Sequence, residues 1–264
     1  MLGFIGTGNM ATAIIKGVIA SGMLKGEDIA VYDIAQDKAK ALAEEYSLNV
    51  FESENEIAGK CDKVILSVKP QVFLSLLKKI DGELKENNPL IISIAAGKTI
   101  EFISSALSYN AKIVRVMPNI NAKVGGAVSA YCGKDTVSED ELDFVRNLCE
   151  SFGIAVNIGE NLFSVYSAIG GCSPAFAYMF IDALARAAVK NGMPKTTALE
   201  VAAGAVLGSA KMILESDEHP WQLVDQVCSP GGTTIEGVTS LQNDSFEAAV
   251  MNAVQAAIDK DKKL

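Results

Sequence analysis

A glycine-rich segment near the first residue has the composition of a phosphate-binding loop. Gly6-Thr7-Gly8-Asn9-Met10-Ala11 follows an apolar run and precedes an amphipathic pattern, so it is expected to join a strand to a helix. Gly6 permits a tight turn, Gly8 lets the backbone approach a pyrophosphate, and Ala11 allows close helix–strand packing. The N–H groups and partial positive charge of a helix N-terminus favour phosphate. We therefore predict a dinucleotide site formed by Gly6, Thr7, Gly8, Asn9 and Met10.

An acidic residue ends the second apolar run, where a ribose-binding carboxylate is expected. Asp33 can accept hydrogen bonds from both hydroxyls of an adenosine ribose, and its charge repels a 2′-phosphate. Residues 34–37 contain no Arg that could bind this phosphate, and Lys38 is the first cation after Asp33. These residues favour NADH over NADPH as the cofactor, although Lys38 or a loop backbone could still accept a 2′-phosphate.

A second glycine-rich segment, Cys228-Ser229-Pro230-Gly231-Gly232-Thr233-Thr234, stands between two helical patterns. The N–H groups of a Pro-Gly-Gly turn that leads into a helix can converge on an anion, and Ser and Thr hydroxyls add donors. The same composition also suits a simple connector between helices. The segment therefore indicates either an anion-binding nest or a connector, and its composition leaves both readings open.

Composition excludes several classes of partner. The 264 residues include 32 Asp and Glu against 23 Lys and Arg, a net charge of −9, with no block of five basic residues. We therefore expect neither a nucleic-acid partner nor a membrane partner. Five scattered cysteines without metal-ligand spacing predict no metal site and a reducing, cytoplasmic location. Charged side chains interrupt the two most apolar stretches, residues 1–24 and 168–189, so neither is expected to span a bilayer.

Short apolar runs alternate with amphipathic segments over residues 1–160, and these elements must position the loops. The alternation predicts a mostly parallel sheet with helices on both faces. Strands are expected over residues 1–5, 29–32, 63–68, 90–95, 112–116, 127–131 and 155–157. Helices are expected over residues 11–21, 37–46, 73–84, 100–107 and 138–151.

Beyond residue 160 the strand patterns stop, and helices are expected over residues 163–190, 197–215, 220–227 and 246–260. A capping box, Thr197-Ala198-Leu199-Glu200, is expected to open the second of them. Gly204 and Gly208 lie on one helix face and allow close approach of another backbone, from this chain or from a second subunit. The predicted fold class is α/β: an N-terminal Rossmann dinucleotide-binding domain (1–160) and an all-helical C-terminal substrate-binding and dimerisation domain (161–264).

These motifs together resemble the pyrroline-5-carboxylate reductase family, whose members catalyse the last step of proline synthesis. The resemblance covers essentially the whole chain, and it is carried by Gly3–Met10, Val68-Lys69-Pro70-Gln71, Ala95-Ala96-Gly97, Arg115–Asn119 and the stretch from Pro220 to Gln242. The chain departs from the family pattern at Ile120-Asn121, where Thr-Pro is usual, and at Cys172-Ser173, where Ser-Gly is usual.

The resemblance implies hydride transfer from NADH or NADPH to the C=N carbon of a small cyclic imine that carries a carboxylate. It implies that Ser229, Gly231, Gly232 and Thr233 bind the carboxylate, and that Thr234 is the catalytic residue, hydrogen-bonding the ring nitrogen. It also implies that the cofactor lies against Val68, Lys69 and Pro70 on its adenosine side and against Ala95 and Ala96 near the nicotinamide. Self-association through the C-terminal helices is expected.

The sequence leaves the roles of two side chains undecided, and it leaves two alternative functions to consider. His219, the one histidine of the chain, could be a general acid or could have a structural role at a helix start. Arg115 could bind a ligand or pack at the end of a strand. A β-hydroxyacid dehydrogenase-like oxidoreductase would need a Lys on the long helix, and residues 168–188 contain none. A non-catalytic dinucleotide-binding regulator would keep the first loop without needing the second.

Overall fold

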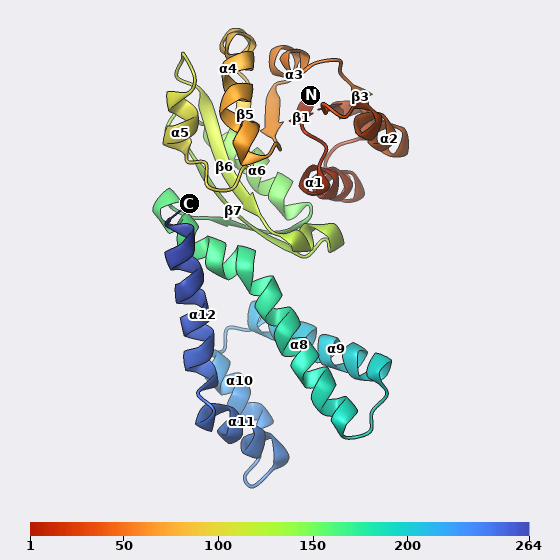
Figure 1. Ribbon diagram of the computed structural model, residues 1–264, viewed down its shortest axis with the longest axis vertical. Helices are drawn as coiled ribbons and strands as arrows, with labels where there is room; N and C mark the ends of the chain where they lie inside the picture. Colours follow the sequence, from red (N-terminus) through yellow and green to blue (C-terminus); the bar gives the residue numbers. More distant parts are fainter. Residues whose placement is uncertain (264) are drawn as a thin grey trace. The chain divides into compact units, whose positions relative to one another are not determined.

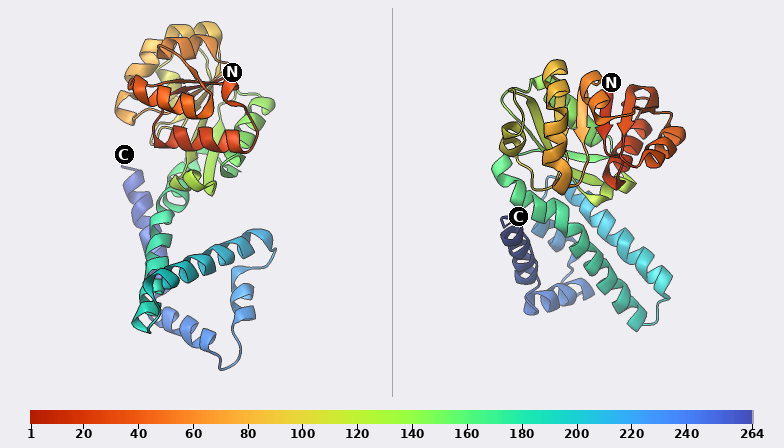
Figure 2. Two further views of the ribbon diagram at one scale, coloured as in Figure 1. Left: turned by 90° about the vertical axis from the view of Figure 1, so that its right-hand side faces the viewer. Right: turned by 45° about the horizontal axis from the view of Figure 1, so that its top comes forward.

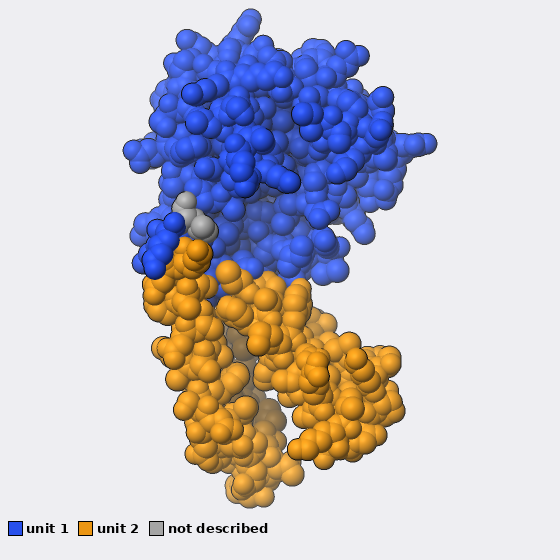
Figure 3. Space-filling model, viewed as in Figure 1, with its two compact units in different colours: residues 1–171, 261–264 blue, residues 172–260 orange. Residues whose placement is uncertain are grey.

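The computed structural model describes residues 1–263 and divides the chain into two compact units (Figure 3). Unit 1 comprises Met1–Gly171 together with the end of the last helix from Asp261, and unit 2 comprises Cys172–Lys260. The boundary after Gly171 comes later in the chain than the boundary after residue 160 that the sequence suggested. The turns that follow residue 160 still pack on unit 1, where Phe163 lies in a small cluster with Ala130 and Cys132.

Unit 1 is built on an eight-stranded sheet with the order β3-β2-β1-β4-β5-β6-β7-β8 (Figures 1 and 2). Neighbouring strands run parallel, except that β6 and β7 are antiparallel. The predicted mostly parallel sheet is therefore confirmed. The strands are β1 (Leu2–Ile5), β2 (Ile29–Tyr32), β3 (Asn49–Val50), β4 (Lys63–Leu66), β5 (Leu90–Ser93), β6 (Lys112–Pro118), β7 (Ala127–Gly133) and β8 (Gly153–Asn157).

Helices cover both faces of this sheet: α1 (Asn9–Ala20), α2 (Gln36–Tyr46), α3 (Glu54–Lys60), α4 (Pro70–Asn87), α5 (Ile100–Ser105) and α6 (Glu139–Glu150). Side chains alternate across the sheet, so Phe4 packs with α1, α2 and α6 in one cluster and Ile5 packs with α3, α4 and α5 in the other. Each such fully buried side chain contributes roughly 1.5–3 kcal/mol to folding. The two clusters hold the strands rigidly and thereby fix where their carboxyl ends lie.

Several local features differ from the sequence-based expectations. The short strand β3 and the helix α3 were not predicted, because two residues and a polar seven-residue segment carry little periodicity. The expected helix over 163–190 is interrupted: α7 (Phe163–Tyr166) leads into a π-helical turn, Ser167–Cys172, before α8. The expected capping box at Thr197 is wrong, because Pro194 already stands at the N-cap and the helix begins at Lys195.

Unit 2 consists of helices: α8 (Ser173–Lys190), α9 (Lys195–Glu215), α10 (Pro220–Val227), α11 (Thr233–Asn243) and α12 (Phe246–Asp261), of which the last residue lies in unit 1. Its buried cluster contains only small side chains, Ala185, Ala198 and Ala202. Large apolar side chains are exposed instead, among them Met179 (73%), Leu207 (71%) and Met251 (71%). Glu160–Lys190 and Lys195–Glu215 are long and apolar enough to cross a bilayer by length and composition alone. Helices that pack against other protein surfaces have the same length and composition, so this is weak evidence for a membrane span.

Candidate functional site

The loop after β1 has the backbone geometry of a phosphate cradle. Gly6 has a φ of +99°, and a Cβ there would lie 2.4 Å from the Ser67 carbonyl oxygen, so only glycine fits. The Gly6 N–H donates to the Tyr32 carbonyl at 2.7 Å, which anchors the loop to β2. At Gly8 a Cβ would meet nothing within 4 Å, so the space in front of this residue is open to a ligand.

The start of α1 offers backbone N–H donors, because no side chain of the protein caps this helix end. Gly8 is the N-cap residue, no side chain caps the helix, and no acidic residue stands in its first turn. The first N–H groups of a helix have no intrahelical partner, and they carry the positive end of the helix dipole. Ala11 is fully buried against the sheet, as a close helix–strand approach requires. A dinucleotide pyrophosphate therefore fits this end of α1.

Asp33 lies directly after β2 and is bound to the same loop. Its Oδ2 accepts hydrogen bonds from the Thr7 N–H at 2.7 Å and from the Thr7 hydroxyl at 3.0 Å, and its Oδ1 accepts one from the Ala35 N–H at 2.9 Å. Partial burial would raise the pKa of Asp33, but these donors outweigh it and lower the pKa below its ordinary value. The side chain is therefore an ionised acceptor at neutral pH.

The remaining predicted cofactor residues follow β4 and β5. Val68, Lys69 and Pro70 form the turn into α4, with Lys69 as the N-cap and Pro70 in the first turn. Ala95 and Ala96 follow β5, the first buried and the second exposed. Because β1, β2, β4 and β5 are parallel, the structure brings all of these residues to the carboxyl edge of one sheet.

In unit 2 the second glycine-rich segment forms a turn in front of α11. The Gly232 N–H donates to the Ser229 carbonyl at 3.0 Å, and Gly231 has a φ of +69°. A Cβ on Gly232 would lie 2.3 Å from the Ser229 Oγ and 3.1 Å from its carbonyl oxygen, so a side chain there would force Ser229 to move. No side chain caps α11, whose first residues are Thr233 and Thr234. The turn thus leaves the N–H groups of Thr233 and Thr234 and the Ser229 hydroxyl for an anion, while the Gly232 N–H serves the turn.

The structure gives His219 and Arg115 structural partners. The Nδ1 atom of His219 accepts from the Trp221 N–H at 3.2 Å, which makes the ring the N-cap of α10. Arg115 is buried with its guanidinium 4.3 Å from the centre of the Phe163 ring, and its Nη1 lies 3.1 Å from Glu160 Oε1. The cap contact of His219 uses only its Nδ1 atom, whereas Arg115 would have to give up its contacts with Phe163 and Glu160 to bind a ligand.

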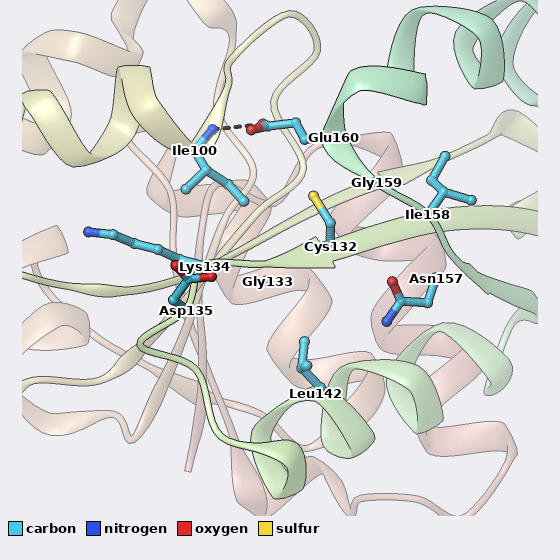
Figure 4. Close-up of a pocket in the computed structure, with 10 residues that line it drawn as sticks. All are labelled: Ile100, Cys132, Gly133, Lys134, Asp135, Leu142, Asn157, Ile158, Gly159 and Glu160. Carbon is cyan, nitrogen blue, oxygen red and sulfur yellow. Dashed lines mark hydrogen bonds between the residues drawn. The ribbon is translucent and has the colours of Figure 1, made fainter.

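A pocket of about 480 Å³ in unit 1 lies apart from the predicted site residues, between the ends of β7 and β8 and the start of α5 (Figure 4). Glu160 closes one side and accepts from the Ile100 N–H at 2.8 Å. Cys132 also lines the pocket, and burial raises the pKa of its thiol to about 11, so it is no nucleophile at neutral pH. In residues 1–263 no three His, Cys, Asp or Glu side chains gather as a metal site.

The structural role of Asn119 was not predicted from the sequence. Its buried side-chain amide donates to the Gly170 carbonyl at 2.9 Å, inside the π-helical turn, and its Oδ1 accepts from the Asn121 N–H. A π-helical turn disturbs the regular ladder of helical hydrogen bonds, so carbonyls in it need other donors. The adjacent glycines Gly170-Gly171 in an otherwise apolar helix were the available signal.

Comparison with known proteins agrees with this arrangement. Residues 160–264 match the family model described as pyrroline-5-carboxylate reductase dimerisation, and residues 1–97 match the one described as NADP oxidoreductase, coenzyme F420-dependent. The chain is 42% identical over 263 residues to pyrroline-5-carboxylate reductase of Escherichia coli strain K12, covering 100% of this chain and 97% of that protein.

Two solved structures are similar over nearly their whole length. A pyrroline-5-carboxylate reductase from Coxiella burnetii has a TM-score of 0.94 at 30% identity, covering 99% of this chain and 97% of that one. The Plasmodium falciparum pyrroline carboxylate reductase with NADP bound has a TM-score of 0.86 at 35% identity, with the same coverage. With full-length relatives at these identities, the chain belongs to the pyrroline-5-carboxylate reductase family.

Proposed function

We propose that this protein reduces 1-pyrroline-5-carboxylate to L-proline with NADH or NADPH. The observation that carries the proposal is the pair of uncapped, glycine-preceded helix N-termini, α1 in unit 1 and α11 in unit 2. The first suits a dinucleotide pyrophosphate and the second suits a small carboxylate. Membership of the family supports this reading over a β-hydroxyacid dehydrogenase and over a non-catalytic regulator.

The residues of unit 2 would bind and orient the cyclic imine. The N–H groups of Thr233 and Thr234 and the Ser229 hydroxyl would hold the carboxylate at the start of α11. The Thr234 hydroxyl would hydrogen-bond the ring nitrogen, which in the iminium form of the substrate already carries its proton, so that hydride addition to the adjacent carbon completes the reduction. The bound reduced nicotinamide supplies the hydride. No strong general acid is required if the imine binds already protonated, and His219 is then left to its role as a helix cap.

The residues of unit 1 would bind the cofactor, and we infer a preference for NADH. Asp33 is held close to the phosphate loop with its negative charge intact. A 2′-phosphate near this carboxylate would be repelled by about 1–4 kcal/mol at roughly 4 Å, depending on screening. Lys38 is exposed and flexible and would offset only part of that repulsion.

Residues 160–264 would mediate self-association, as the description of their family model states. Exposed apolar side chains on α8, α9 and α12 give this contact a large surface, and Gly204 and Gly208 leave room for close helix packing. The five cysteines are unpaired, which supports a location in the reducing cytoplasm.

The proposed function is tested by following the oxidation of NADH and NADPH side by side with 1-pyrroline-5-carboxylate. We expect turnover with the imine, formation of proline, and no effect of a metal chelator. A β-hydroxyacid supplied with NAD⁺ or NADP⁺, the oxidised cofactors that its oxidation requires, is the matched control and should give no turnover. Absence of proline formation with both cofactors would remove the proposal.

A further inference from the structure

One carboxylate ties the phosphate loop to the end of β2. Thr7 donates to Asp33 Oδ2 twice, from its N–H at 2.7 Å and from its hydroxyl at 3.0 Å. Thr7 is only 6% exposed, and Asp33 stands 26 positions further along the sequence, so this is a partly buried tertiary contact. The β1–α1 loop and the β2–α2 turn are therefore held together as one piece.

The two oxygens of Asp33 have different surroundings. An ionised carboxylate offers about four acceptor directions, two on each oxygen. Both directions of Oδ2 are used by Thr7, whereas Oδ1 accepts one hydrogen bond from the Ala35 N–H. A ribose hydroxyl would therefore meet Oδ1, where it displaces no donor of the protein. Loop anchoring and ligand contact are thus separated between the two atoms of one side chain.

The loop needs an anchor because Thr7 lies between two glycines. Gly6 is held in the left-handed region, and Gly8 has open space in front of it. Glycine loses more conformational freedom on ordering than any other residue, so a loose glycine-rich loop binds a ligand with a large entropic loss. An anchor that orders the loop beforehand reduces this loss and raises affinity.

We propose that Thr7 is a positioning residue for the cofactor pyrophosphate and that it acts through Asp33 Oδ2, separately from the Asp33 charge already inferred to favour NADH over NADPH. This inference rests on the proposed use of a dinucleotide, but on neither the imine nor catalysis. Removal of the Thr7 hydroxyl then lowers the binding affinity for every ligand that carries a 5′-diphosphate, and it does so by the same factor for each. The preference between the two cofactors stays unchanged.

A double-mutant cycle of Thr7→Val and Asp33→Ala tests the proposal, with Thr7→Ser as the matched control that keeps the hydroxyl. Binding of ADP is measured by calorimetry, and binding of NADH and NADPH by fluorescence titration. Loss of one charge-assisted hydrogen bond predicts that Thr7→Val weakens all three ligands about fivefold or more. Thr7→Ser should bind as the unchanged protein does. In the Asp33→Ala background the Thr7 substitution should have no further effect.

Several outcomes overturn the proposal. One is that the unchanged protein does not bind ADP, and another is that Thr7→Val binds ADP with unaltered affinity. The others are that the Thr7→Val substitution reduces affinity equally in the unchanged protein and in the Asp33→Ala variant, or that it reduces the affinities for NADH and NADPH by different factors. Thermal unfolding and circular dichroism of each variant separate loss of affinity from loss of the fold, and a folded Thr7→Ser keeps the test decisive if Thr7→Val does not fold. Thr7-dependent ADP binding without imine turnover would remove the proposed function and leave this inference in place.

Discussion

Asp33 supplies a negative charge and also an acceptor that holds Thr7, and a comparison of two substitutions separates these two roles. Asp33→Ser removes the charge and also the anchor of Thr7, whereas Asp33→Asn keeps the shape and an oxygen that can accept from Thr7. We expect both to narrow or reverse the ratio of kcat/KM for NADH over NADPH. The like-charge repulsion predicts a change between about fivefold and several hundredfold.

Steady-state kinetics with both cofactors on the unchanged protein and on the two variants check this prediction. Asp33→Asn should retain more NADH affinity than Asp33→Ser, because the loop keeps its anchor. A preference for NADPH in the unchanged protein that neither substitution alters would mean that the ribose does not meet Asp33.

Thr234 is the second residue whose role is separable. Thr234→Ala removes the hydroxyl proposed for the ring nitrogen, and kcat/KM for the imine should fall about tenfold or more, from one hydrogen bond worth roughly 1–3 kcal/mol. The dissociation constant for NADH, measured by fluorescence titration, should hardly change. Thr234→Ser is the matched control and should restore most of the activity. Weakened NADH binding with normal turnover would reverse the assignment of the two loops.

At the scale of elements, the π-helical turn Ser167–Cys172 depends on a donor from another element. Asn119→Ala leaves the Gly170 carbonyl without its buried partner, so unit 1 should lose about 1–3 kcal/mol of unfolding free energy. Urea unfolding at neutral pH measures the loss. Asn119→Asp is the control that keeps the size but not the donor, and it should destabilise at least as much. A loss below about 0.5 kcal/mol in both variants would show that water or another donor replaces the amide.

How much of these elements could be predicted depended on whether the signal was local. The loop from Gly6 to Met10 was predictable because tight turns and close approach require glycine at particular positions. The contact between Thr7 and Asp33 was not, because it depends on the pairing of β1 with β2. The π-helical turn was missed because one extra residue per turn barely disturbs an apolar helical pattern, and α3 because a polar seven-residue helix has almost no periodicity. Composition identified the glycine-rich turn before α11 as either an anion nest or a connector, but the use of the Gly232 N–H within the turn required coordinates.

At the scale of the whole molecule, we expect a homodimer or a larger assembly. The apolar side chains exposed on α8, α9 and α12 are too numerous for a stable isolated surface, and the matched family model covers these helices. Light scattering on the purified protein at micromolar concentration checks the prediction. The charge substitution Leu207→Glu should weaken the assembly if α9 takes part, while Lys85→Glu on the exposed end of α4 serves as a control. A stable and active monomer would contradict it.

The three alanines that form the buried cluster of unit 2 have a consequence for how the chain acquires its structure. So small a cluster contributes little to stability, whereas the sheet of unit 1 has two extensive clusters of its own. During synthesis the first 171 residues can fold while the rest is still emerging from the ribosome. We expect the helical half to complete its folding on contact with a second copy, so its melting temperature should rise with protein concentration while that of unit 1 stays nearly constant.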